Sequence, residues 1–120
     1  MYIFNKCTSG IDIRLSGGSV ESEGRVEVFR NGSWGTVCGA FVWSLSEAIV
    51  VCKSLGYPGA LEAKPSAFFG KGKGMIWLDQ VRCSGDETVL TKCLHNNVTT
   101  SDHSDDVGVV CKEGTVQDMI

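Results

Sequence analysis

The sequence predicts a small α+β domain cross-linked by disulfide bonds, and three observations support this class. The segment GRVEVFRNGSWGTVC (24–38) has the pattern of a β-hairpin. The segment SLSEAIVVCKSLGY (44–57) has apolar residues at helical spacing behind a capping box. The six cysteines, at positions 7, 38, 52, 83, 93 and 111, form no CxxC pair, which disfavours zinc-ribbon and thioredoxin-like sites.

Length and composition limit the classes of protein to which the chain can belong. At 120 residues it has room for one domain. The hydrophobic share of 42% and the charged share of 21% are those of a globular chain, and the net charge of −3 gives no support for nucleic-acid binding. No apolar run approaches the roughly 18 residues of a membrane span. Fifteen glycines and an even number of scattered cysteines favour an extracellular module, and six buried thiols in a cytosolic protein are the alternative.

The first predicted elements are a strand and a hairpin. Apolar and polar residues alternate in IDIRLSGG (11–18), which is the period of a half-buried strand, and a glycine pair ends it. In the hairpin, Asn31-Gly32 is a strong turn signal because a type I′ turn needs φ > 0 at both central residues. A two-residue loop predicts that Phe29 pairs with Trp34.

The same register predicts a pair between Val26 and Val37. It places Val26, Val28 and Val37 on one face of the hairpin, and Phe29, Trp34 and Cys38 on the other. Because both faces carry bulky apolar groups, we expect this part of the sheet to be covered on both sides.

The main helix is predicted in SLSEAIVVCKSLGY. Ser44 and Glu47 form an S-x-x-E capping box, in which each side chain can satisfy a free amide at the start of the helix. Gly56 stands where a C-terminal cap belongs. The residues expected to face inward are Leu45, Ala48, Cys52 and Leu55.

The remaining segments predict two strands, a short helix and loops. A glycine-punctuated loop precedes a strand from Met75 to Val81, and its run GKGKG lacks the GxxxxGK[ST] spacing of a phosphate-binding loop. A second S-x-x-E box, Ser84 with Glu87, predicts a short helix that ends near Cys93. The polar segment HNNVTTSDHSDD (95–106) is expected to be a loop, VGVVC (107–111) a last strand, and KEGTVQDMI (112–120) a tail.

Taken together, these segments resemble the scavenger receptor cysteine-rich (SRCR) domain family. The matching pieces are IRLSGG, EGRVEVFRNGSWGTVC, AIVVCKSLGYPGALEA, FFGKGKGMIWLDQVRCSGDE and HSDDVGVVC, in the family's order. The resemblance implies an SRCR domain over residues 11–112, with an N-terminal arm (1–10) and a C-terminal tail (113–120). It also implies a curved antiparallel sheet that cradles the main helix. The expected location is extracellular, in a secreted protein or the ectodomain of a membrane receptor, as part of a larger multidomain chain.

The resemblance implies two disulfides directly, Cys52 with Cys111 and Cys83 with Cys93. The family's third bridge would join Cys38 to a cysteine at a position that is Ser101 here.

Cys7 lies outside the family's standard set of cysteines. We therefore expect a substitute bridge between Cys7 and Cys38. The alternative is that Cys7 pairs with another domain or chain and Cys38 remains a buried thiol.

Many members of the family hold calcium or magnesium on clustered carboxylates. Their first site draws on two acids that directly follow the cysteine of TVC, and this chain has Gly39 and Ala40 there. We therefore expect that no cofactor is required and that the first cation site is degenerate, although Ca²⁺ or Mg²⁺ could bind the acids that remain. The candidate metal ligands are Asp79, Asp105 and Asp106, and for Asp79 a solvated surface position is the alternative.

The hairpin is similar to the stretch implicated in bacterial binding in mucosal members of the family, although core packing alone explains its apolar residues. A polyanion-binding patch would also form if the fold gathered the basic residues on one side. The candidate ligand-binding residues are Arg25, Glu27, Arg30, Trp34, Lys71, Lys73 and Arg82. Two N-glycosylation sequons, at Asn31 and Asn97, predict exposed loops of a secreted glycoprotein.

Two functions are compatible with these observations. The first is a non-catalytic recognition module that binds polyanionic, microbial-surface, glycan or protein ligands in host defence or endocytosis. The alternative is an accessory or spacer domain of a secreted multidomain enzyme, such as a protease or a lysyl-oxidase-like protein. No enzymatic activity is predicted, because the sequence has no GxSxG or HExxH motif and no identifiable nucleophile.

Overall fold

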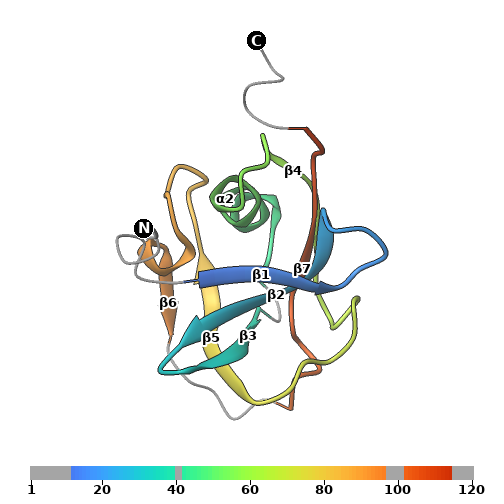
Figure 1. Ribbon diagram of the computed structural model, residues 1–120. Coiled ribbons are helices and arrows are strands. Elements are labelled where there is room, and N and C mark those ends of the chain that lie inside the picture. Colours follow the sequence, from blue (N-terminus) through green and yellow to red (C-terminus); the bar gives the residue numbers. More distant parts are fainter. Residues whose placement is uncertain (1–11, 40–41, 97–101, 115–120) are drawn as a thin grey trace, which may run out of the picture.

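The computed structural model describes residues 12–39, 42–96 and 102–114 (Figure 1). These residues form seven strands, one α-helix and one 3₁₀ helix. The elements are β1 (Asp12–Gly17), β2 (Glu23–Arg30), β3 (Ser33–Cys38), α2 (Leu45–Ser54), β4 (Ala60–Lys64), β5 (Met75–Arg82), η1 (Leu90–Lys92), β6 (Leu94–Asn96) and β7 (Gly108–Cys111). No helix in these ranges is long and apolar enough to cross a membrane.

The strands form one sheet that branches at β2. On one side β2 pairs with β1, and on the other side it pairs with both β3 and β7, all antiparallel. One branch continues from β3 to β5 and β6, and the other from β7 to β4. The sheet curls around α2, as expected (Figure 1). One pairing in the sheet is not antiparallel: β3 and β5 run parallel.

The hairpin register is confirmed at its turn and wrong beyond it. Phe29 pairs with Trp34, as predicted. Val26 and Val37 do not pair, because Val107 lies between them: the Val26 amide donates to the Val107 carbonyl (2.9 Å), and the Val107 amide donates to the Val37 carbonyl (3.0 Å). The hairpin signal is local, so it does not reveal that the segment leading into β7 separates the two strands.

The two faces of the hairpin differ in burial. The three valines of one face are fully buried in the core with α2. On the other face Cys38 is buried, but Phe29 is 36% exposed and Trp34 is only half-buried. The expectation that both faces are covered is therefore wrong near the turn, because the helix packs on the valine face alone.

Both ends of α2 form as predicted. The capping box between Ser44 and Glu47 is present. At the other end, Gly56 has φ +97°, and the Tyr57 amide donates to the Cys52 carbonyl (2.9 Å). This is the hydrogen-bond pattern of a Schellman motif, which satisfies carbonyls that the last turn leaves free.

The inward face of α2 is wider than the apolar spacing indicates. Ala48 and Cys52 are fully buried, as predicted, and so are Val50 and Val51, whereas Leu45 is 47% exposed. Successive helical residues are about 100° apart, so the buried arc is centred near Val51 and Leu45 lies at its margin. Strands of both branches surround the helix, which explains the wide arc.

The second helix is shorter than predicted. The Ser84 amide does donate to the Glu87 carboxylate (3.0 Å), but no helix begins there, and the only helical turn in this segment is η1. Gly85 has φ +107°, a conformation outside the right-handed helix, so the Ser84–Glu87 contact closes a turn instead of capping a helix.

The strands predicted from Met75 and over VGVVC are confirmed as β5 and β7, whereas β4 and β6 were not predicted. Both disulfides implied by the resemblance are present, Cys52–Cys111 and Cys83–Cys93. Cys7 lies outside the described residues, so its bridge to Cys38 stays a prediction. The proposed N-terminal arm and most of the tail lie outside them as well.

Candidate functional site

The register of the first three strands places polar residues side by side on the face opposite the valines. Arg14 of β1 pairs with Glu27 of β2, which in turn pairs with Thr36 of β3. One row further along, Ser16 pairs with Arg25. Because side chains of directly paired residues point to the same side of a sheet, these groups form one continuous surface, here called the polar face.

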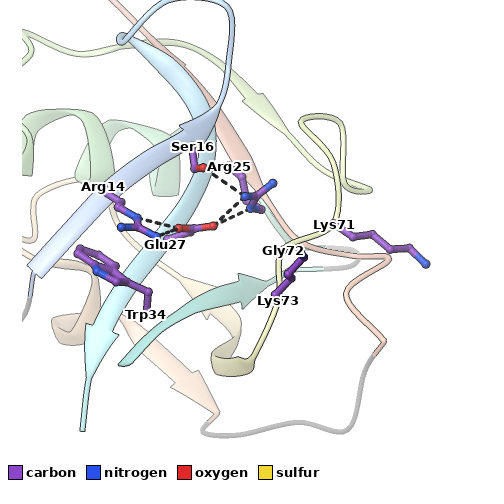
Figure 2. A pocket seen from close by; sticks show the side chains of 8 residues that line it. All are labelled: Arg14, Ser16, Arg25, Glu27, Trp34, Lys71, Gly72 and Lys73. Atoms are coloured by element: carbon purple, nitrogen blue, oxygen red, sulfur yellow. Dashed lines mark hydrogen bonds and ion pairs between the residues drawn. The ribbon is translucent and has the colours of Figure 1, made fainter. Parts of the chain in front are cut away.

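Glu27 lies at the centre of the polar face and is only 6% exposed. One carboxylate oxygen accepts from Arg14 Nε (2.8 Å) and Nη2 (2.7 Å). The other accepts from Arg25 Nε (2.9 Å) and Nη2 (2.8 Å). Two guanidinium groups thus converge on one carboxylate, each with two nitrogens on a single oxygen (Figure 2), and these charge-assisted contacts fix the direction of both groups.

Arg25 is fully engaged within the domain. Its Nη1 donates to the carbonyls of Phe69 (3.2 Å) and Gly70 (3.3 Å), and its Nη2 donates to Ser16 Oγ (3.2 Å). The side chain is 14% exposed. Arg25 therefore ties the beginning of the glycine-lysine loop (residues 70–74) to the sheet.

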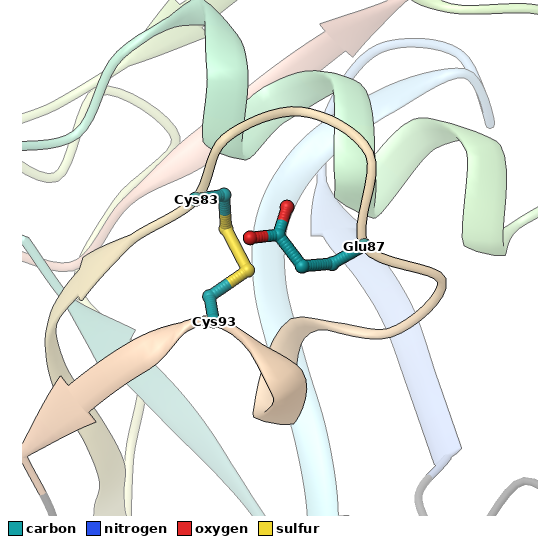
Figure 3. Close-up of side chains that lie close together, drawn as sticks. All are labelled: Cys83, Glu87 and Cys93. Atoms are coloured by element: carbon teal, nitrogen blue, oxygen red, sulfur yellow. A yellow bond between two sulfur atoms is a disulfide. The ribbon is translucent and has the colours of Figure 1, made fainter.

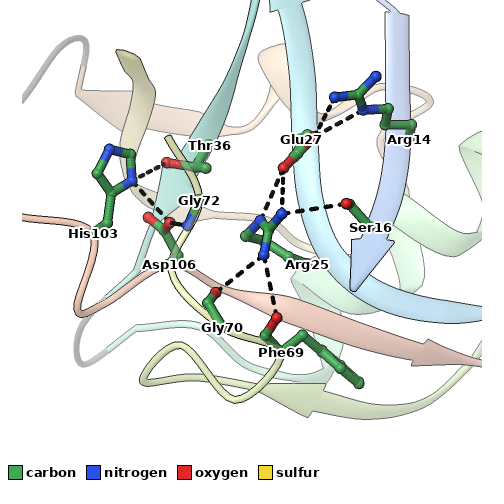
Figure 4. Close-up of polar contacts among 10 residues, drawn as sticks. All are labelled: Arg14, Ser16, Arg25, Glu27, Thr36, Phe69, Gly70, Gly72, His103 and Asp106. Carbon is green, nitrogen blue, oxygen red and sulfur yellow. Dashed lines mark hydrogen bonds and ion pairs between the residues drawn. The ribbon is translucent and has the colours of Figure 1, made fainter. Parts of the chain in front are cut away.

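Asp106 provides a second anchor for the glycine-lysine loop. Its carboxylate is 1% exposed and accepts from the Gly72 amide (2.8 Å). His103 lies against this carboxylate, with Nδ1 2.9 Å from Asp106 Oδ2 (Figure 4). On its other side, His103 Nε2 lies 3.0 Å from the Gly74 carbonyl oxygen, at the end of the loop. The loop is thus fixed at three points along its length.

The middle of the glycine-lysine loop requires a residue without a side chain. A Cβ on Gly72 would lie 2.4 Å from Thr36 Cγ2, closer than real contacts allow, and 3.2 Å from Asp106 Oδ2, which is tighter than most real contacts. The backbone at Gly72 can therefore lie directly on the polar face. Lys71 and Lys73, on either side, are left exposed.

The loop and the polar face enclose a hollow of about 360 Å³, here called the basic cleft. Four basic side chains and one carboxylate contribute to its lining, although the chain as a whole is acidic. The lining residues are Arg14, Ser16, Arg25, Glu27, Trp34, Lys71, Gly72 and Lys73 (Figure 2). The Arg14 guanidinium lies 4.1 Å from the centre of the Trp34 ring, a cation–π contact.

An acidic group lies near one of the lysines. Hydrogen bonds from the side chain and amide of Ser104 lower the pKa of Asp102, and the charge of Lys71 lowers it further. Asp102 is thus a charged neighbour with which an anionic ligand competes for Lys71.

The structure gathers five of the seven predicted ligand-binding residues in the basic cleft: Arg25, Glu27, Trp34, Lys71 and Lys73. Arg30 and Arg82 do not line it, and Arg82 borders a separate hollow beside β6. Arg14 was missed. Its place in an alternating strand was visible in the sequence, but only the pairing of β1 with β2 brings it to the cleft.

Within the described residues, the predicted metal ligands Asp79, Asp105 and Asp106 do not form a group of close ligand atoms. Asp106 anchors the glycine-lysine loop, and the Asp79 carboxylate accepts from the side-chain Nε2 of Gln80 (3.3 Å). The Asp105 carbonyl accepts from the Gly39 amide (3.1 Å), so a residue without a carboxylate lies beside Asp105. Calcium prefers six to eight oxygen ligands, and the described residues around Asp105 do not fit that requirement.

Cys83, Glu87 and Cys93 are the only group of three metal-ligating residue types that lie close together within the described part of the chain (Figure 3). The two sulfurs form a disulfide and are not thiolate ligands. Hydrogen bonds from the amides of Ser84 and Gly85 lower the pKa of Glu87. This group is therefore a cross-linked loop and not a metal centre.

Of the two predicted glycosylation sites, Asn31 is exposed in the hairpin turn. Asn97 lies outside the described residues.

Comparisons with known proteins identify the family to which this fold belongs. The family model "Scavenger receptor cysteine-rich domain" matches residues 16–112. Lysyl oxidase homolog 2 of Gallus gallus is 49% identical over 106 residues, which are 86% of this chain but only 14% of that protein.

Two solved structures share the fold at substantial sequence identity. The third SRCR domain of murine neurotrypsin matches with a TM-score of 0.79 and 44% identity, over 87% of this chain and 98% of that one. The dimeric form of the SRCR domain of mouse MARCO matches with a TM-score of 0.66 and 35% identity, over 91% and 100%. Such domains are extracellular or ectodomain modules and are generally non-catalytic. The chain described here belongs to the scavenger receptor cysteine-rich family.

Proposed function

We propose that this domain is an extracellular, non-catalytic recognition module that binds anionic ligands in the basic cleft. The observation that carries the proposal is that Arg14, Lys71 and Lys73 all line one hollow of an otherwise acidic chain. A cleft lined by one sign of charge raises the local concentration of oppositely charged ligands.

The cations of the cleft have different roles in this proposal. Arg25 is held by Glu27 and by loop carbonyls, so it positions the loop. The Arg14 side chain is 48% exposed, and Lys71 and Lys73 are exposed too, so these three are available to a ligand. Sulfated or carboxylated glycans, microbial-surface polymers and acidic protein segments all offer the complementary charge. Such ligands suit a role in host defence or endocytosis.

Binding at a single cleft is expected to be weak. Exposed ion pairs contribute about 0.2–1 kcal/mol each and are screened by salt. Strong binding would then come from several copies of the module acting on one polymer, because linked sites raise the effective concentration of the second contact.

A second function is favoured by a separate observation, the 49% identity with lysyl oxidase homolog 2. The chain spans 14% of that protein's length, so the domain would be one accessory module in a much larger enzyme. In that setting the basic cleft would hold an acidic segment of the same protein or of a partner. The domain would contribute positioning and no chemistry.

The proposal is tested with a heparin-derived hexasaccharide, whose binding is measured by calorimetry at low salt. The double variant Lys71→Gln/Lys73→Gln should weaken binding by about 2- to 30-fold, since two exposed ion pairs are lost. The control is Lys53→Gln/Lys92→Gln, which removes the same charge from two exposed lysines outside the cleft. The affinity of this control for the hexasaccharide should be within about twofold of that of the unmodified domain.

Equal weakening by both double variants would contradict the proposal, because it would show that net charge and not the cleft governs binding. Addition of EDTA should leave the affinity unchanged, since the described residues around Asp105 do not fit a hard cation. A loss of binding with EDTA would show that a bound cation carries the contact instead.

A further inference from the structure

The hairpin turn has the sequence and geometry of an accessible N-glycosylation acceptor. Asn31-Gly32-Ser33 is an N-x-S sequon, and all three residues are exposed. The turn is closed by the pair of Arg30 with Ser33, and Asn31 has φ +49°. A Cβ built on Gly32 would meet nothing within 4 Å, so the turn projects into open space.

A sequon alone is weak evidence, but a second feature lies beside this one. Phe29, two residues before Asn31, keeps 36% of its surface exposed. Its ring meets Trp34 edge-on, with centroids 5.3 Å apart and planes at 62°. Trp34 is in turn occupied by the Arg14 guanidinium, 4.1 Å from its ring centre. Phe29 is therefore a fixed aromatic ring with uncovered surface at the end of the hairpin.

We propose that Asn31 carries an N-linked glycan whose first sugar packs on the exposed ring of Phe29. The ring of N-acetylglucosamine has an apolar C–H side, and an aromatic ring offers a flat surface for dispersion contact. Packing would remove apolar surface of both groups from water. The glycan would thus stabilise the folded hairpin in addition to extending from it. This inference does not depend on the proposed function and requires only passage through a secretory pathway.

The covalent step is a glycosyl transfer without oxidation or reduction. Asn31 Nδ2 forms a bond to the anomeric carbon of an oligosaccharide that is linked to a lipid diphosphate. The bond from that carbon to the diphosphate oxygen breaks, the lipid diphosphate leaves with the electron pair, and Nδ2 loses one proton. Both the oligosaccharide donor and the transferase are supplied by the host cell.

The test uses the chain expressed with a secretion leader in a mammalian host, with Asn97→Asp in every variant so that one sequon remains. Intact mass and glycopeptide mapping should show glycan on Asn31. The matched form without glycan is Ser33→Ala, which removes the sequon and keeps an asparagine at the left-handed position. Thermal unfolding should occur about 2–6 °C higher in the glycosylated form.

The role of Phe29 is then isolated by combining substitutions. In a Phe29→Ala background the difference between the glycosylated form and its Ser33→Ala counterpart should vanish, and in a Phe29→Tyr background it should remain. Because Phe29 is at the surface, the Phe29→Ala chain is expected to fold, and the Phe29→Tyr variant tests the same contact with the ring kept. An unoccupied Asn31 in secreted protein overturns the inference. A glycan-dependent shift that is as large with Phe29→Ala as with phenylalanine overturns it too.

Discussion

At the scale of single residues, Glu27 is the group on which the basic cleft depends. It is a buried carboxylate that accepts from two guanidinium groups, one half exposed and one largely buried. Without it, two positive charges would face each other across adjacent strands. Glu27 is therefore better described as a positioning residue than as a ligand contact, and the same holds for Arg25.

Replacement of Glu27 by glutamine should destabilise the domain. The amide keeps one acceptor oxygen, but its NH₂ group would face a guanidinium donor, and the largely buried Arg25 would lose its counter-charge. We expect Glu27→Gln to lower the free energy of unfolding by roughly 1–3 kcal/mol, measured by urea denaturation. Arg14→Gln is the control and should cost less than about 1 kcal/mol, because Arg14 is half exposed. A larger loss for Arg14→Gln would contradict this assignment.

At the scale of elements, the turn that follows Cys83, between β5 and η1, is held by the Glu87 side chain. The Glu87 carboxylate accepts from the Ser84 amide (3.0 Å), the Ser84 hydroxyl (3.1 Å) and the Gly85 amide (3.1 Å). The hydrogen bond from the Ser84 amide is the main cause that lowers the pKa of Glu87. The turn is thus held by a carboxylate in its ionised form.

Acid should weaken this turn, because it protonates the Glu87 carboxylate. Because the pKa of Glu87 is lower in the folded state than in the unfolded state, its contribution to stability is present above the unfolded pKa. It is lost as the pH falls through the folded pKa. The difference in unfolding free energy between the unmodified domain and Glu87→Gln should therefore be present at pH 7 and disappear in acid. Urea denaturation as a function of pH measures it.

The control for this measurement is Asp86→Asn, one residue earlier. Asp86 is exposed, and its carboxylate accepts no hydrogen bond from the described residues. The effect of Asp86→Asn on the free energy of unfolding should be small at every pH. A Glu87→Gln effect that stayed constant from pH 7 down to pH 2 would argue against the carboxylate as the holding group.

At the scale of the whole molecule, two disulfides of very different span hold the sheet and helix together. Cys52–Cys111 joins α2 to β7 across 59 positions of sequence, and Cys83–Cys93 closes a local loop across 10. In the chain-entropy model a longer closed loop restricts the unfolded chain more. The long bridge is therefore the main covalent constraint on the relation of helix to sheet.

Removal of the two bridges should have unequal effects. Cys52→Ala/Cys111→Ala should lower the free energy of unfolding by roughly 4 kcal/mol, and Cys83→Ala/Cys93→Ala by roughly 3 kcal/mol. Both cysteines of the long bridge are buried, so their replacement by alanine also leaves cavities in the core, and these lower the stability further. The free energy of unfolding of a small domain is only about 5–15 kcal/mol, so the Cys52→Ala/Cys111→Ala variant should be secreted poorly. Urea denaturation compares the two, and the prediction fails if loss of the short bridge costs more.

Much of the fold was predictable because its signals are local. The alternation in β1, the Asn31-Gly32 turn and the capping box of α2 each act within a few residues, and each formed where expected. The strands β4 and β6 carry weak local patterns and exist through pairing with β7 and β5. For the same reason the parallel pairing of β3 with β5 could not be predicted from either strand.

The candidate site was predictable only in part. Lys71 and Lys73 stood out as a basic loop, and Arg25 and Trp34 as hairpin residues. The division of roles among them was not visible in the sequence, because it depends on contacts between distant segments. In the sequence, Arg25 resembles a ligand-binding residue. In the structure, its guanidinium donates to the carbonyls of Phe69 and Gly70.

By itself the sequence determined the turn of the hairpin and the ends of α2, and its resemblance to a family supplied two cysteine pairings. Only the tertiary structure decided that Val107 enters between two strands, that Asp106 anchors Gly72 and that Arg14 joins the basic cleft. Hairpin turns and helix ends are set by backbone conformation and by side chains only a few residues apart in the sequence. The other contacts join residues far apart in sequence, so they depend on strand register and on the curl of the whole sheet.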